Sequence, residues 1–447
     1  MNAIPVYYET TLVGTITVAE DGPSFAYDPR WADVRGAFPV SLRTPLGSVA
    51  PPAVLVPWLQ NLLPEGAPLL TVGRTLGISP QDAVGMVEKI GRDTAGALSI
   101  GRPRRGAAPG YRPVPDEAAL ERIIAELPAK PFLVGEEGVS MSLAGAQYKL
   151  PMAVADGRFA IPVDGARSTH ILKPDNTRLW GSVQNEALCL VLARRAGLNA
   201  AEVTTGVAGE RSYLLVTRYD RLLRNDKWFR LHQEDFCQAL GKPPGAKYEH
   251  NQTGIKGPSL TDFFTLARQY MGPGDVIAIL RAVILNVLLT NVDSHAKNYS
   301  LLLSGRGARL APLYDLMCGA AWANVTQNMA QDIGGKNRGR HIHARHWRRM
   351  AQACGLGRAA VLRNVAALAE KVAAEVASAM EEVESMPAGG HPMLQRFADE
   401  IVARCALVAA NLREDGPRDD LPEESQEDFE HAPETTLDGT VSPPSGI

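Results

Sequence analysis

The stretch NVDSHAKNYS, residues 291–300, is the strongest single indication of the fold that we expect of this chain. It follows DVIAILRAVILNVLLTNV, residues 275–292, which is apolar on nearly every face and is interrupted by Arg281 and Asn286. Those two polar residues favour a helix buried in a protein core over a membrane-spanning helix. The strand YSLLL, the turn SGRG and the strand ARLAPLYD come next, so a hairpin is predicted to end at Asp315.

Asp293 and Asn298 lie five positions apart in this stretch, a spacing that matches the catalytic loop of protein kinases. In that loop the aspartate accepts the proton of the substrate hydroxyl, and the asparagine oxygen helps to hold Mg²⁺. Asp315 can supply a second oxygen ligand, because Mg²⁺ keeps waters and phosphate oxygens and needs few protein carboxylates. The alternative interpretation is that Asp293 and Asn298 cap a helix and form a turn.

Two further features fit a nucleotide cleft. The stretch SMSLAGAQYKLP, residues 140–151, places small residues before a strand, as a loop that binds phosphate through its backbone N–H groups requires. It contains neither of the common glycine-rich phosphate motifs, so a plain loop is the alternative. Lys173 lies in the apolar strand HILKP and needs an anion, for which Glu186 on the following helix is the expected partner. The pair matches the lysine and glutamate that position phosphates in kinases, and a structural salt bridge is the alternative.

The first hundred residues predict a small α/β unit. IPVYYETTLVGTITV alternates as a strand pair does, with Gly14 near its turn. An amphipathic helix is expected over residues 54–63, ended by Pro64 and Gly66. After this unit, residues 102–117 are rich in Pro, Gly and Arg and make the best linker in the chain.

Strand signals dominate from residue 140 to about residue 218. Asp156 and Gly157, between two apolar runs, predict a hairpin, and Ser182 is expected to cap a helix that ends before Gly197. RSYLLVTRYD closes this half, and residues 217–220 lie where a kinase hinge offers backbone groups to adenine. Helices then dominate to about residue 413, so a nucleotide cleft between a strand-rich and a helical lobe is predicted.

The composition excludes several classes of protein. With 447 residues, 45% hydrophobic and 21% charged, the chain can form two or three domains and is neither a collagen nor a coiled coil. We find no apolar stretch long enough for a membrane span and no secretory leader. The five cysteines are scattered and odd in number, so we expect a reducing, cytoplasmic environment. Because no apolar stretch is long enough to span a bilayer, we expect no membrane partner.

The net charge of −3 hides an asymmetry. Residues 414–447 hold 11 acidic residues and one basic residue, so 45 of the 46 basic residues but 38 of the 49 acidic residues lie before them. This acidic tail is predicted to be disordered, and the rest of the chain carries a net charge of +7. That modest excess alone does not indicate nucleic-acid binding.

HIHARHWRRM, residues 341–350, contains the pattern H-x-H-x-x-H among several arginines. No carboxylate or cysteine accompanies the histidines, so a cationic helix surface is favoured over a zinc site. Whether the Arg- and His-rich residues 338–349 contact acidic protein or DNA phosphate is left open.

Together these motifs resemble the HipA-type toxin kinases, the serine/threonine kinases of bacterial type II toxin–antitoxin pairs. The resemblance extends from about residue 5 to about residue 355. It rests on FPVSLRTP, LLPEG, LGISPQDAVGMVEKIGRDTAGALSI, SLAGAQYK, HILKP, SVQNE, VTRYDR, RLHQEDFCQALG, KYE, DSHAKN and PLYD. It implies an α+β, bilobal protein-kinase-like fold, with a strand-rich N-lobe that carries an extra N-terminal α/β subdomain, and an all-helical C-lobe. The expected order is an N-terminal subdomain at 1–101, a linker at 102–117, the N-lobe at 118–220, the C-lobe at 221–413 and the acidic tail at 414–447.

The resemblance also implies roles for individual residues. Asp293 is implied as the catalytic base, Asn298 and Asp315 as the Mg²⁺ ligands, and Lys173, paired with Glu186, as the phosphate-binding lysine. The hinge departs from the family pattern, with Thr217 where an acidic residue is usual. The other residues implied to contact ATP are Ala144, Gly145, Ala146, Gln147, Tyr148, Lys149, Thr217, Arg218, Tyr219, His295, Ala296, Lys297 and Tyr314, besides Asn298 and Asp315.

The reaction implied is the Mg²⁺-dependent transfer of the ATP γ-phosphoryl group to a serine or threonine hydroxyl of another protein. Ser142 matches the serine that these kinases autophosphorylate, which in the family ejects the phosphate loop and silences the enzyme. Family targets are translation factors, chiefly aminoacyl-tRNA synthetases. Members are restrained by a helix-turn-helix, HipB-like antitoxin that binds operator DNA. Two alternatives stay open: a pseudokinase-like corepressor that holds an antitoxin on DNA, and a small-molecule or lipid kinase.

Overall fold

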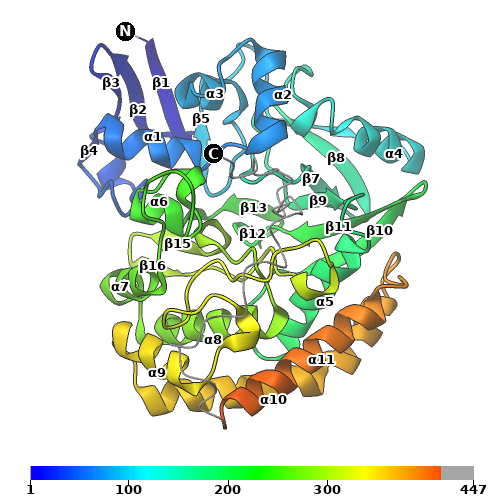
Figure 1. Ribbon diagram of the computed structural model, residues 1–447. Helices are drawn as coiled ribbons and strands as arrows, with labels where there is room; N and C mark the ends of the chain where they lie inside the picture. The colour runs from blue at the N-terminus through cyan, green and yellow to red at the C-terminus, as the bar shows by residue number, and fades with distance from the viewer. Residues whose placement is uncertain (1, 414–447) are drawn as a thin grey trace, which may run out of the picture.

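The computed structural model describes residues 2–413, and its N-terminal unit is a five-stranded sheet with three helices (Figure 1). The sheet order is β4-β3-β2-β1-β5, and every neighbouring pair is antiparallel. The strands are β1 (Asn2–Tyr8), β2 (Thr11–Ala19), β3 (Gly22–Tyr27), β4 (Val49–Ala50) and β5 (Leu98–Ile100). The helices are α1 (Pro52–Gln60), α2 (Gly66–Leu76) and α3 (Ala83–Ile90). The predicted α/β unit is therefore present.

The predicted position of the first turn is wrong. The chain reverses at Glu9, whose φ of 55° is left-handed, and Gly14 lies inside β2. A Cβ atom at Gly14 would collide with the ring of Phe25 and the backbone oxygen of Ala26 on the neighbouring strand. Gly14 is thus required for close packing within the sheet, a role that a sequence pattern does not separate from a turn.

Two predicted helix boundaries also differ. Helix α1 ends at Gln60, three residues early, and Gly66 begins α2 instead of ending a helix. Ser182 is the first residue of its helix and not the cap, because its Oγ accepts a hydrogen bond from the Asn176 N–H (2.9 Å), a group outside the helix.

A six-stranded antiparallel sheet follows, in the order β10-β11-β9-β7-β8-β6. Its strands are β6 (Gly110–Pro113), β7 (Leu150–Ala155), β8 (Arg158–Val163), β9 (His170–Pro174), β10 (Val203–Ala208) and β11 (Arg211–Thr217), accompanied by α4 (Glu117–Glu126) and α5 (Ser182–Arg195). Asp156 and Gly157 form the predicted turn between β7 and β8, with φ values of 49° and 72°. Residues 102–117 are not wholly a linker, because β6 pairs with β8 at the sheet edge, where Pro113 is tolerated.

The remainder is mostly helical. Its helices are α6 (Phe236–Leu240), α7 (Leu260–Tyr270), α8 (Pro273–Leu289), α9 (Ala344–Ala353), α10 (Arg358–Glu384) and α11 (Leu394–Asn411). It also holds two small antiparallel sheets, made of β12 (Arg221–Arg224) and β13 (Lys227–Arg230), and of β14 (His232–Asp235), β15 (Ser300–Ser304) and β16 (Gly307–Leu310). The mixture of sheets and helices confirms the α+β class. The expectation of helices alone in this lobe is wrong, because the buried strand β15 contributes Leu301 and Leu303 to its core.

Two hydrophobic clusters hold the chain together. One fills the N-terminal unit and continues into the six-stranded sheet at Leu150 and Leu172. The other joins α8, α10 and α11 and includes α5, which Figure 1 shows beside α10 and α11. Helix α5 thus connects the strand-rich lobe to the helical lobe. No helix within residues 2–413 is long and apolar enough to cross a bilayer, and the predicted acidic tail lies outside the described residues.

Candidate active site

A cavity of about 1020 Å³ lies where the N-terminal unit, the six-stranded sheet and the helical lobe meet. All three regions contribute to its wall, as Glu65, Lys173 and Asp293 illustrate. The predicted site residues that line it are Ala144, Gly145, Ala146, Gln147, Tyr148, Lys149, Lys173, Glu186, Thr217, Arg218, Tyr219, Asp293, His295, Lys297, Asn298, Tyr314 and Asp315. Ser142 and Ala296 are buried outside this lining. The structure therefore brings nearly all of the predicted site residues to one cavity.

Lys173 is a buried cation held between two carboxylates. Its Nζ lies 2.7 Å from Oε1 of Glu186 and also contacts the carboxylate of Asp315. Burial alone would lower the pKa of Lys173, but the charges of Asp315 and Glu186 outweigh it and raise that pKa. Burial would likewise raise the pKa of Asp315, and Lys173 followed by Lys149 lowers it instead. Both groups are therefore charged at neutral pH.

The predicted phosphate loop turns at Gly145, whose φ of +103° is accessible mainly to glycine. The Nζ of Lys149 donates to the backbone oxygen of Ala144 (2.7 Å) and so closes the loop on itself. Burial lowers the pKa of Lys149, and the charge of Asp315 opposes that effect. Ser142 lies before the loop, is fully buried, and donates from Oγ to the backbone oxygen of Leu62 (2.8 Å).

The loop after α8 carries Asp293 at the cavity wall. The backbone N–H of Asp293 donates to Oδ1 of Asn291 (3.2 Å), and Nδ2 of Asn298 donates to the backbone oxygen of Asp293 (2.7 Å). Nδ2 of Asn291 also reaches the backbone oxygen of Asp315 (3.4 Å). These three bonds fix Asp293, Asn298 and Asp315 relative to one another.

Tyr248, in the motif KYE, has no role predicted from the sequence, but it contacts two of the predicted site residues. Its hydroxyl donates to Oδ1 of Asp293, and its ring packs edge-on against His295 with centroids 5.0 Å apart. The preceding residue, Lys247, accepts the Ala296 N–H at its backbone oxygen (3.1 Å). Residues 247 and 248 are therefore bound to the loop at residues 293–298 by both backbone and side chain.

His295 and Lys297 have different surroundings within the same loop. Burial, reinforced by the charges of Lys247 and Lys297, sets the pKa of His295 well below its usual value, so its ring is neutral. The Nζ of Lys297 lies 2.7 Å from Oδ1 of Asn61 and 3.0 Å from Oδ2 of Asp235. The Lys297 ammonium is thus held by the N-terminal unit and by β14.

The predicted hinge lies at the end of β11. The N–H of Thr217 donates to the backbone oxygen of Glu202 (2.9 Å), and the N–H of Arg218 donates to that of Thr169 (3.0 Å). Both N–H groups are already engaged, so they can donate to a nucleotide only if it displaces the protein carbonyls. The ring of Tyr219 stacks on Tyr314 with centroids 5.7 Å apart, at the cavity wall.

The side chain of Arg218 belongs to a buried ionic network that joins the hinge to the N-terminal unit. Asp93 lies 2.8 Å from Arg221, 3.3 Å from Arg230 and 3.6 Å from Arg218. Asp220 lies 2.7 Å from Arg218 and accepts the N–H of Gly96. Burial opposes ionisation of Asp93, but Arg221, Arg218 and Arg230 lower its pKa. The network could not be predicted from the sequence, because Asp93 and Gly96 lie more than 120 residues before the arginines and Asp220.

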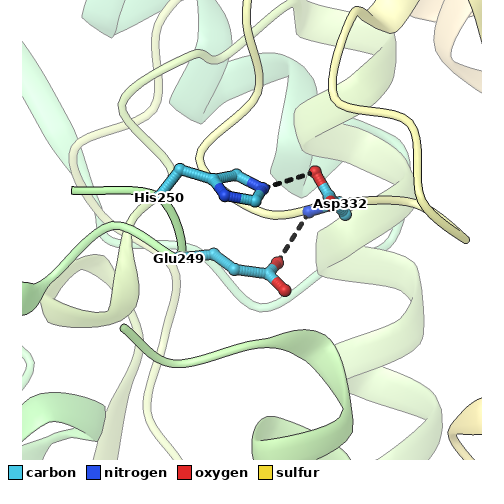
Figure 2. Close-up of side chains that lie close together, drawn as sticks. All are labelled: Glu249, His250 and Asp332. Atoms are coloured by element: carbon cyan, nitrogen blue, oxygen red, sulfur yellow. Dashed lines mark hydrogen bonds and ion pairs between the residues drawn. The ribbon is translucent and has the colours of Figure 1, made fainter. Parts of the chain in front are cut away.

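A second polar cluster lies outside the cavity and consists of Glu249, His250 and Asp332 (Figure 2). Nε2 of His250 lies 3.0 Å from Oδ1 of Asp332, and the Asp332 N–H donates to Oε2 of Glu249 (2.8 Å). The His250 side chain is 64% exposed. Within residues 2–413 nothing beyond these mutual contacts points to an ion. We therefore infer that the cluster connects the loop at residues 249–250 to the loop at residue 332.

The histidines at residues 341–350 have different surroundings, since His341 is exposed whereas His346 is buried. Nδ1 of His346 accepts the backbone N–H of His343 (2.9 Å) at the first turn of α9. Within residues 2–413 these histidines do not gather with acidic or cysteine side chains as a set of metal ligands.

The chain matches the HipA N-terminal domain family over residues 4–101 and the HipA-like C-terminal domain family over residues 141–383. It is 36% identical over 425 residues to "Putative kinase Y4mE" of Sinorhizobium fredii, covering 92% of this chain and 100% of that protein. It is 28% identical over 411 residues to the serine/threonine-protein kinase toxin HipA of Shewanella oneidensis, covering 88% and 93%.

A solved complex of Shewanella oneidensis HipA with HipB and its operator DNA provides a structural counterpart. A chain of this complex matches with a TM-score of 0.82 and 25% identity, over 93% of this chain and 100% of that chain. This match confirms the predicted kinase-like fold.

Proposed function

This chain belongs to the HipA family of serine/threonine kinase toxins, and from that premise we propose that it transfers the γ-phosphoryl group of ATP to a serine or threonine hydroxyl of another protein. One observation carries the proposal. Lys173 from β9, Asp293 and Asn298 from the loop after α8, and Asp315 line a single cavity between the lobes. That is the arrangement that phosphoryl transfer requires, because its catalysis consists of positioning and charge neutralisation.

The residues at the cavity wall fit a Mg²⁺ ion held by Asn298 and Asp315. Because Nδ2 of Asn298 donates within the protein, its amide oxygen is the atom suited to a cation. Asp315 is ionised, since Lys173 and Lys149 lower its pKa. Oxygen ligands of this kind are those that Mg²⁺ prefers. When bound, the ion would supply positive charge to the phosphate oxygens.

The side chains of the protein perform the remaining steps. Asp293 orients the acceptor hydroxyl and accepts its proton as the new O–P bond forms and the bond to the ADP oxygen breaks. The charged Lys173, positioned by Glu186, neutralises the phosphates from the opposite lobe. Residues 144–149 line the same cavity, and their backbone N–H groups would bind the phosphate oxygens.

Incubation of the full chain with γ-³²P-labelled ATP and Mg²⁺, alone and with a bacterial lysate, tests this proposal. We expect label on Ser142 and on a lysate protein. Asp293→Gln should lower the rate by several orders of magnitude, because the variant cannot accept the proton. Absence of label on both, or a fully active Asp293→Gln chain, would overturn the proposal. Competition between protein and metabolite hydroxyls would reveal a small-molecule kinase.

For the cellular role we propose, on the family resemblance, that the substrate is a translation factor such as an aminoacyl-tRNA synthetase in the bacterial cytoplasm. A phosphoproteomic comparison of cells that express the parent or Asp293→Gln would identify it. We also propose a HipB-like helix-turn-helix antitoxin as a partner that holds the chain at operator DNA, as the solved Shewanella oneidensis complex suggests. If the chain is mainly a corepressor, Lys173→Ala will leave operator repression unchanged.

A further inference from the structure

Helix α9 has a basic face on the side opposite to the hydrophobic core. Trp347 and Met350 are buried in the core of the helical lobe. Arg345, Arg348 and Arg349 recur at spacings of three and four residues, which place them on the opposite face of the helix. Arg348 and Arg349 are exposed. One side of α9 therefore carries a row of guanidinium groups.

The segment before α9 adds positive charge to the same surface. Nη1 of Arg349 donates to the backbone oxygen of Gly334 (3.0 Å), so this segment lies against the basic face. From residue 333 to residue 369 the sequence has eight lysines and arginines and no aspartate or glutamate. Like charges at such short spacings repel one another and attract polyanions. We define the cationic face as Lys336, Arg338, Arg340, Arg345, Arg348 and Arg349.

Helix α11 ends next to this face. Nδ2 of Asn411 donates to the backbone oxygens of Arg340 (3.1 Å) and Ile342 (3.2 Å), directly before α9. Asn411 is itself buried, so the end of α11 is fixed at this place. Figure 1 shows α9 and the C-terminal end of α11 at the same edge of the helical lobe. The described part of the chain therefore ends beside the cationic face.

The sequence that follows, residues 414–447, lies outside the described residues and has the opposite charge. It holds 11 acidic residues and one basic residue, and nine of the acidic residues fall within 414–430. Helix α9 has ten residues and is therefore about 15 Å long. An extended chain spans that length in about five residues. An acidic segment of more than sufficient length is thus attached next to a basic surface.

We propose that residues 414–430 bind the cationic face of the same chain, and that an acidic polypeptide is the partner this face accepts. The contact does not depend on the proposed kinase function. A short tether gives a second binding group an effective concentration on the order of millimolar. A nucleic acid or another acidic protein therefore has to displace residues 414–430 before it can bind the same arginines.

Zero-length cross-linking of the full chain tests what lies on the face. A carbodiimide couples carboxylates to amines and leaves arginine unmodified, so Arg348→Lys introduces a reactive group and keeps the charge. Peptide mass spectrometry of the monomeric chain should find position 348 joined to carboxylates of residues 414–430. Arg122→Lys, at an exposed position of α4 in the strand-rich lobe, is the matched control and should not be joined to them. No link at position 348, or equal yields at both positions, would overturn the proposal.

Protection from a glutamate-specific protease measures the strength of the contact. Cleavage after the glutamates of residues 414–430 should be slow in the parent at an ionic strength of about 0.05 M and faster at about 0.5 M, because salt screens exposed charges. Replacing Arg340, Arg348 and Arg349 by Gln should accelerate cleavage at low salt about fivefold. In this variant the rate should depend little on salt.

A matched control makes the same change of charge elsewhere. Arg35, Arg105 and Arg122 are exposed in the strand-rich half, and their replacement by Gln should leave the rate at the parent value. The native cysteines are all buried, so their modification by iodoacetamide reports global unfolding in each sample. If the triple variant of the cationic face unfolds, the cross-link at position 348 still decides, because Arg348→Lys keeps the charge.

Two results of the protease experiment would contradict the proposal. One is an equal rate of cleavage in the parent, the variant of the cationic face and the control. The other is unchanged cleavage in a folded variant that no longer binds a fluorescent DNA duplex, which would assign the face to nucleic acid. Faster cleavage in the variant of the cationic face alone, with the native cysteines unmodified, supports the proposal.

Discussion

Lys173 in β9 and Glu186 in α5 form a buried ion pair with 2.7 Å between Nζ and Oε1. Although α5 follows β9 closely in sequence, its apolar side chains belong to the cluster of α8, α10 and α11. The pair therefore fixes the position of a strand-lobe lysine relative to the helical lobe. Asp315 contacts the same ammonium group, so one cation joins the two sides of the cavity.

Tyr248→Phe is predicted to slow phosphoryl transfer while ATP binding is retained. The substitution keeps the ring against His295 and removes the hydroxyl that orients Asp293. We expect kcat to fall by about tenfold with the KM for ATP unchanged within twofold, since only positioning of the base is lost. Steady-state kinetics measures this, with Tyr270→Phe on α7 as the control. An unchanged kcat, or a rise in KM alone, would disagree with this role.

Asp93→Asn is predicted to destabilise the fold strongly. Asp93 is 1% exposed and lies against three arginines, which keep their charges when the carboxylate is removed. Loss of one partner of a buried ion pair costs about 3–5 kcal/mol. Urea denaturation measures the loss, and Asp28→Asn, which removes a surface partner of Arg30, should leave the midpoint unchanged. Equal midpoints for both variants would show that the network contributes nothing.

Glu234 is predicted to make the protein less stable as the pH rises. Burial raises its pKa to about 8, and the N–H of Leu42 donates to its Oε1 (2.8 Å) while Asp235 repels the ionised form. Between pH 4.5 and about 8 the folded protein keeps a proton that the unfolded chain releases. Stability is therefore lost through that window, by at most about 1.4 kcal/mol per pH unit.

Denaturation of the parent and of Glu234→Gln between pH 6.5 and 8.5 checks this sign. The variant has no proton to lose, so its stability should change less with pH. Burial lowers the pKa of the neighbouring His232 to about 4, so its contribution changes only below this range, where stability falls as the pH falls from 6.5. Parallel curves for the two proteins would contradict a protonated Glu234.

Local patterns predicted the parts of the site that lie close together in sequence. Neighbouring residues in the sequence determine the spacing of Asp293 and Asn298, the apolar helix before them and the hairpin to Asp315. These features could therefore be predicted without a structure. Lys173 stood out because a lysine in an apolar strand requires an anion. Glu186 was found as its partner, whereas the additional contact with Asp315 arises from a pairing across 142 residues.

The remaining site residues could not be placed from the sequence. LLPEG and KYE were visible as motifs, but the contact of Glu65 with Lys247 spans 182 residues and depends on how the N-terminal unit packs. Gly14 was misplaced for a related reason, since only the neighbouring strand shows why a Cβ is excluded there. The positions and contacts of such residues depend on tertiary packing, which the periodicity of the sequence does not reveal.

Calorimetric titration of the full chain with ATP and Mg²⁺ tests most directly whether residues of both lobes bind one nucleotide. We predict that the parent binds MgATP, and that Lys173→Ala and Asp315→Asn each weaken binding at least tenfold. The control Lys371→Ala, which removes an exposed lysine of α10, should leave binding unchanged. Failure of the parent to bind MgATP, or parental affinity in both cavity variants, would contradict the account.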